Sequence, residues 1–120
     1  MPKSEYNEIL LAHANHPSHE GEIKNPDFKN TAYNTSCGDE ITLMLKLDKD
    51  GQISDASWAG EGCAIAKATA DILCCTLLRE NSDNVILDEV AQTMPGRVKC
   101  IETAFNTLIG APPSALLFLL

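Results

Sequence analysis

Positive charge is scarce in this sequence. Lysine and arginine together account for 9 of the 120 residues, against 17 aspartate and glutamate residues, and the formal net charge is −8. A negatively charged surface repels the phosphate backbones of nucleic acids. We therefore expect no nucleic-acid partner.

Long hydrophobic runs are also missing. The apolar stretch over residues 115–120 has only six residues, whereas a helix that crosses a bilayer needs about 20. Residues 1–8 have neither the basic flank nor the apolar run of a secretory signal, so we expect a cytoplasmic protein with no membrane partner. Because 44% of the residues are hydrophobic and 22% are charged, the composition is that of a folded chain. The length suits one domain over residues 1–120.

The five cysteines include no Cys-x-x-Cys pair. An odd number of cysteines in a chain without an export signal argues against a disulfide framework, because the cytosol keeps thiols reduced. The missing pair also disfavours a thiol-redox enzyme. Metal binding or another thiol chemistry is the leading interpretation.

Hydrophobic alternation predicts a small β-sheet in the first half of the chain. Residues 41–47 place apolar side chains at every second position, which predicts a strand with one buried face and a polar face that includes Met44. Turn residues follow at 48–51, and 52–58 is expected to be the return strand of a hairpin. Residues 28–35 are expected to add a third strand.

Helical patterns lie on both sides of these strands. Ser4 is expected to cap an N-terminal helix that ends before His16. Residues 63–79 are rich in alanine and leucine without glycine or proline, which predicts a long buried helix. Two more helices are expected over 84–93 and 101–108. Strands followed by helices, without βαβ alternation, predict an α+β domain whose helices pack on one face of a small antiparallel sheet of about three strands.

Three cysteines and one aspartate stand out by their positions. Cys37 and Asp39 flank a glycine in a loop before the alternating strand, so both side chains can face one point. Cys63 and Cys100 are each expected at the N-terminus of a helix, where the helix dipole and free N–H groups favour the thiolate and lower its pKa. Such thiols are good nucleophiles and good metal ligands.

These four residues are chemically suited to a metal. Three thiolates and a carboxylate can form a tetrahedral zinc site, and thiolates equally suit an iron–sulfur cluster, for which aspartate is a weaker ligand. The alternative is that the cysteines are ordinary buried residues. We prefer that alternative for Cys74 and Cys75. Cys74 lies 11 residues beyond Cys63, roughly 16 Å along a helix, which is too far to share a metal.

Other residues are expected to have structural roles. His13, His16 and His19 surround a proline segment, and such histidines more often form a polar surface or contact a helix end than bind a metal. Trp58 is expected to pack in the core or at the hairpin edge. The apolar residues 115–120 are a candidate interaction surface.

Three segments, in order, resemble the motifs of the SufU/IscU family of iron–sulfur assembly proteins, which includes the N-terminal domain of NifU. They are residues 34–39, 60–71 and 97–101. His13, Pro17 and Gly21 also resemble a family segment that follows the first helix. The resemblance covers nearly the whole chain except the C-terminal tail, and it implies the α+β fold of that family.

The resemblance implies one metal or cluster site made of Cys37, Asp39, Cys63 and Cys100. IscU-type scaffolds have a histidine before the third cysteine, whereas this chain has Lys99 there. That difference makes the chain more similar to the SufU branch, although the stretch between Cys63 and Cys100 lacks the longer insertion common in SufU proteins.

In the SufU branch the four ligands hold zinc, and the third cysteine accepts persulfide sulfur from a cysteine desulfurase of the SufS type. The arginine three residues earlier supports the transfer. By resemblance, Cys100 and Arg97 are the catalytic residues of a zinc-dependent sulfurtransferase. The first alternative is a non-enzymatic scaffold that builds a 2Fe–2S cluster and hands it to apoproteins or cluster carriers. The second is a structural zinc-binding interaction domain.

Overall fold

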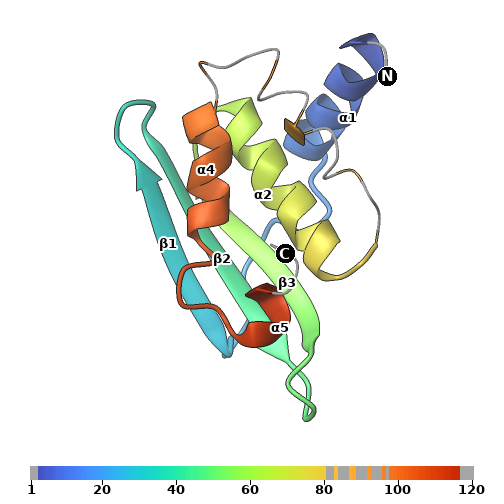
Figure 1. Ribbon diagram of the computed structural model, residues 1–120, viewed down its shortest axis with the longest axis vertical. Coiled ribbons are helices and arrows are strands. Elements are labelled where there is room, and N and C mark those ends of the chain that lie inside the picture. Colours follow the sequence, from blue (N-terminus) through green and yellow to red (C-terminus); the bar gives the residue numbers. More distant parts are fainter. Residues whose placement is uncertain are drawn as a thin grey trace.

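The computed structural model describes residues 3–80, 83, 87, 88, 92, 96 and 98–116, and for residues 3–7 it describes the backbone alone. Three strands form one antiparallel sheet in the order β1–β2–β3 (Figure 1). They are β1 (Phe28–Asn34), β2 (Asp39–Leu47) and β3 (Ile53–Glu61). The predicted hairpin and third strand are confirmed, and β3 continues to Glu61 rather than ending at Trp58.

Four helices accompany the sheet within the described part of the chain. They are α1 (Lys3–Asn15), α2 (Ala64–Leu77), α4 (Val98–Asn106) and α5 (Pro113–Leu116). α2 and α4 cover one face of the sheet (Figure 1), whereas α1 packs chiefly against α2. The predicted α+β class is confirmed. The helix expected over 84–93 falls mostly outside the described residues.

α2 is the centre of the packing because it is apolar around most of its circumference. Its Ala70 and Leu73 belong to the core that α2 forms with the sheet and α4. Its Ile72 belongs to a second core, which Leu10 of α1 and Ile101 of α4 complete. The predicted buried helix is confirmed, with its last residue two positions earlier than expected.

The face of β2 that was predicted to be polar is buried around Met44. That side chain is 2% exposed, and its partner across the strands is Ser57 of β3. The Ser57 hydroxyl lies 2.9 Å from the carbonyl oxygen of His19 and 2.6 Å from that of Gly21. The connection between α1 and β1 therefore passes over this part of the sheet, and both faces are covered there.

The two ends of the chain differ from the predictions in detail. Ser4 is a residue of α1, which already includes Lys3, so it is not the N-cap. α1 does end at Asn15, before His16, as predicted. At the other end Ala115 of α5 is buried in the main core, so the tail begins docked on the fold, and residues 117–120 lie outside the described residues. None of the described helices is long and apolar enough to cross a membrane.

Candidate functional site

The loop between β1 and β2 presents Cys37 and Asp39. The backbone N–H of Cys37 donates to the carbonyl oxygen of Asn34 over 3.3 Å. Gly38 follows with a φ of 73°, a conformation that glycine adopts without steric penalty. The turn leaves Cys37 exposed and brings Asp39, the first residue of β2, to a buried position.

Cys63 and Cys100 approach this loop from two helix N-termini, as predicted. Cys63 is the N-cap of α2, and Cys100 lies in the first turn of α4. Donor atoms of Cys37, Asp39 and Cys100 all lie within 4.8 Å of one another, and the Cys100 thiol also forms a hydrogen bond with that of Cys63. The fold therefore gathers the four residues at one place, although they come from three separate segments.

Asp39 connects the loop to α2. Its Oδ1 accepts the backbone N–H of Cys63 over 3.0 Å, and its Oδ2 accepts the side-chain amide of Asn34 over 3.3 Å. Gly62 is required beside it, because a Cβ at that position would lie 2.5 Å from Oδ1. Sequence reasoning assigned no role to Asn34 or Gly62, although both lie within the family-like segments. They position the candidate ligands.

The prediction of a lowered thiol pKa is wrong for Cys100. Burial raises the pKa of this thiol, the hydrogen bond with Cys63 and the nearby negative groups raise it further, and it reaches about 12. The N-terminus of α4 favours the thiolate, but burial, together with the clustering of Cys63, Asp39 and Cys37 around the same sulfur, outweighs that effect. Proximity of the cysteines could not be inferred from sequence spacing.

The chemistry of this donor set fits a cation. Thiolates and a carboxylate are ligands of zinc and of iron–sulfur clusters. Four such groups can lose their protons together only where positive charge balances them. Cys74 and Cys75 are buried in α2, as predicted, and Lys99 is exposed on α4. Arg97 lies outside the described residues.

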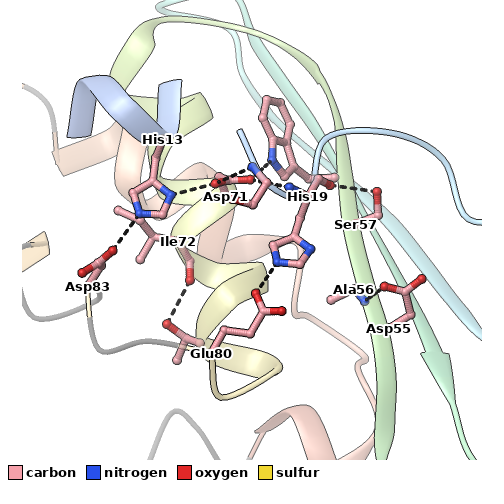
Figure 2. A network of polar contacts seen from close by, with 12 residues as sticks. His13, His19, Asp55, Ala56, Ser57, Asp71, Ile72, Glu80 and Asp83 are labelled. Carbon is pink, nitrogen blue, oxygen red and sulfur yellow. Dashed lines mark hydrogen bonds and ion pairs between the residues drawn. The ribbon is translucent and has the colours of Figure 1, made fainter. Parts of the chain in front are cut away.

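A second polar cluster surrounds Asp71, a fully buried residue of α2 (Figure 2). Its carboxylate lies 2.7 Å from Nδ1 of His13 and accepts the indole N–H of Trp58 over 3.1 Å. It also accepts the backbone N–H groups of Ser18 and His19. The opposite ring nitrogen of His13, Nε2, lies 2.9 Å from a carboxylate oxygen of Asp83.

This cluster extends one expectation and corrects another. Trp58 is buried as predicted, and it also anchors Asp71. His13 was expected on a polar surface or in contact with a helix end, but it is 8% exposed and bridges two carboxylates. No sequence signal pointed to this pairing, because His13 and Asp71 are 58 positions apart.

We expect the histidine of this cluster to make stability depend on pH. The hydrogen bond to Asp71 raises the pKa of His13, burial opposes it, and Asp83 raises it again, with a net increase above 6.5. The stabilisation is fully present below pH 6.5 and is lost as pH rises through the raised pKa. Burial alone would raise the pKa of Asp71, but its hydrogen bonds, led by the one from His13, lower it below 3.8. This contribution is present above pH 3.8 and is lost on acidification.

Urea unfolding of the wild type and of His13→Asn across this range measures the effect. The difference in unfolding free energy between the two proteins should be largest between pH 3.8 and 6.5 and should shrink at alkaline pH. A difference that is constant up to about pH 9 would contradict a charged His13.

Comparison with known proteins places the chain in a family. Residues 5–108 match the profile of the NifU-like N terminal domain. The chain belongs to this family. An iron–sulfur cluster assembly scaffold protein IscU from Thermotoga maritima is 32% identical over an alignment of 130 residues, which spans 88% of this chain and 91% of that protein. The zinc-dependent sulfurtransferase SufU from Bacillus subtilis is 35% identical over 68 residues, which cover 57% of this chain and 45% of that protein.

Solved structures agree with membership of the NifU-like family. A protein assigned as an iron–sulfur cluster assembly scaffold for the SUF system, from Fervidobacterium islandicum AW-1, superposes with a TM-score of 0.70 at 25% identity, over 92% of this chain and 98% of that one. A crystal structure described only as a hypothetical protein superposes with a TM-score of 0.77 over the same shares. The resemblance drawn from the three motifs is thus confirmed for both family and fold.

Proposed function

We propose that this NifU-like chain acts in iron–sulfur cluster assembly as a zinc-dependent acceptor of persulfide sulfur. The observation that carries the proposal is the convergence of Cys37, Asp39, Cys63 and Cys100 at one end of α2 and α4. The partner that supplies sulfur is a cysteine desulfurase of the SufS type. The receivers are apoproteins or cluster carriers, and the compartment is the cytoplasm.

The four residues would hold the zinc ion. Bound zinc supplies the positive charge that keeps three thiols deprotonated near neutral pH. The protein's own contribution is positional. Asn34 and the N–H of Cys63 fix the two oxygens of Asp39, and Gly62 leaves room for that carboxylate.

Cys100 is the proposed acceptor. Its thiolate attacks the outer sulfur of the desulfurase persulfide, a new S–S bond forms at Cys100, and the old S–S bond breaks. The desulfurase cysteine leaves as a thiolate, so no net oxidation or reduction is needed. Cys100 is fully buried whereas Cys37 is exposed. Transfer therefore requires a local movement that exposes the Cys100 sulfur. Arg97 would assist by stabilising the attacking thiolate.

A scaffold for a 2Fe–2S cluster is the second candidate function. It is favoured by the IscU relative, which matches over most of both chains. The same three cysteines and Asp39 would then hold iron rather than zinc. A structural zinc module differs from both, because stripping the metal would unfold it. Circular dichroism with a chelator separates that case, since an exchangeable site leaves the chain folded.

The deciding experiment is a titration of desulfurase turnover. A SufS-type desulfurase, with cysteine and a reductant, is titrated with the zinc-loaded protein in the absence of iron. We expect saturable stimulation, and the metal-stripped protein serves as the control. No stimulation of an active, matched desulfurase would overturn the sulfur-acceptor proposal. Assembly of a 2Fe–2S cluster on the protein when iron is supplied would then favour the scaffold function.

A further inference from the structure

A second group of metal-binding donors lies at the opposite end of α2 from Cys63. Nε2 or Nδ1 of His19, Sγ of Cys75 and a carboxylate oxygen of Glu80 all lie within 4.8 Å of one another. Cys75 follows Cys63 by 12 residues, about 18 Å along the helix axis. This group is therefore separate from the Cys37, Asp39, Cys63 and Cys100 site.

The backbone around His19 is held firmly. Its N–H donates to Asp71 over 2.9 Å, and its carbonyl oxygen accepts the N–H of Trp58 over 3.0 Å and the hydroxyl of Ser57 over 2.9 Å. These contacts attach the connection between α1 and β1 to both α2 and β3. Figure 2 shows the His19 ring directed from this anchored backbone toward Glu80.

The end of α2 turns Glu80 back over Cys75. The N–H of Glu80 donates to the carbonyl oxygen of Cys75 over 2.9 Å, and the N–H of Arg79 donates to that of Thr76 over 3.0 Å. This is the Schellman arrangement that ends many helices. It requires a left-handed residue, here Arg79 with a φ of 58°, although glycine occupies that position at lower cost. The turn places an acidic side chain beside a buried thiol.

The neighbouring histidine is not available as a ligand. His13, Asp71 and Cys75 also have donor atoms within 4.8 Å of one another. Both ring nitrogens of His13, however, lie at hydrogen-bonding distance from carboxylates, those of Asp71 and Asp83. His13 and Asp71 therefore act as supports, since Asp71 fixes the backbone of His19.

An imidazole, a thiolate and a carboxylate are each preferred ligands of zinc. Nε2 of His19 and Oε1 of Glu80 are now 2.5 Å apart, whereas ligands on a tetrahedral zinc ion are separated by about 3.3–3.6 Å. A cation between them thus needs an opening of about 1 Å. The Glu80 side chain is 48% exposed, so it is able to swing outward and to admit the ion from solvent.

We propose that His19, Cys75 and Glu80 form a second, zinc-binding site that leaves one coordination position for water. The cation takes the place of the direct contact between His19 and Glu80 and binds the thiolate of Cys75. It ties the α1–β1 connection to the end of α2. The site itself does not depend on the proposed function. With zinc also bound at the first site, as proposed above, the chain would hold two zinc ions.

Metal stoichiometry by native mass spectrometry and zinc titration tests this proposal. We expect two zinc ions in the wild type, one in Cys75→Ala, and one in Cys37→Ser/Cys63→Ser, which lacks two ligands of the first site. Cys74→Ala is the matched control, because Cys74 is an equally buried neighbour in the main core, and it should keep two ions.

A second variant removes ambiguity if Cys75→Ala does not fold. In the Cys37→Ser/Cys63→Ser background, cobalt should give a thiolate charge-transfer band, and adding His19→Gln should weaken cobalt binding by about tenfold or more. Loss of the second ion should also lower Tm. Failure of Cys37→Ser/Cys63→Ser to bind zinc or cobalt, or cobalt binding that His19→Gln does not change, would overturn the proposal. Loss of desulfurase stimulation with two ions still bound would count only against the proposed function.

Discussion

Replacing Asp71 with alanine is expected to lower the free energy of unfolding by about 3–5 kcal/mol, the range for breaking a buried ion pair. The carboxylate is fully buried and accepts the indole N–H of Trp58 together with two backbone N–H groups. Alanine would leave these donors without an acceptor, and it would leave His13 with Asp83 as its remaining carboxylate. Each unsatisfied buried donor costs about 1–3 kcal/mol.

The size of this effect makes it easy to measure. The free energy of unfolding of an ordinary domain is about 5–15 kcal/mol. The variant should therefore unfold at a lower urea concentration than the wild type, or be unfolded already without urea. Asp50→Ala is the matched control, because Asp50 is an exposed aspartate in the turn between β2 and β3, and its effect should stay within about 0.5 kcal/mol. A loss below about 1 kcal/mol for Asp71→Ala would show that water replaces the carboxylate.

Replacing Cys100 with serine is expected to abolish desulfurase stimulation and to weaken zinc binding at the first site by more than about 100-fold. Substitution of residues that only support the metal ligands lowers metal affinity by about 10–100-fold, so loss of a ligand itself should cost more. Cys100 contacts each of the other cysteine thiols of the site. Serine has nearly the same shape, so the core contacts of α4 should persist. Mass spectrometry of the chain after reaction should find no added sulfur at residue 100.

Cys74→Ala serves as the comparison for this experiment. Cys74 is a buried cysteine outside the site, so its loss tests general damage to α2 without removing a ligand. Circular dichroism should find both variants folded. Full stimulation by Cys100→Ser would overturn both the acceptor assignment and the scaffold alternative, since both require this thiol.

Local periodicity explains which parts of the fold were predictable. The alternation at Ile41, Leu43 and Leu45 corresponds to the buried face of β2, because neighbouring side chains of a strand point to opposite sides. Met44 was misassigned because alternation does not record whether the second face of a strand is covered, which is decided by contacts between distant segments such as that of Ser57 with His19. The same limit explains why Asp71 was not recognised as the partner of His13.

The sequence by itself determined the three strands, the longer described helices, the family and the four residues proposed as ligands, because periodicity and short motifs are local properties of the chain. Only the tertiary structure decided the chemical state of those residues. The pKa of Cys100 rises first because the sulfur is buried and then because Cys63, Asp39 and Cys37 lie around it, and a motif records neither burial nor such distances. The cluster of His19, Cys75 and Glu80 is likewise a product of packing, since the α1–β1 connection and the end of α2 meet only when the sheet and helices are assembled.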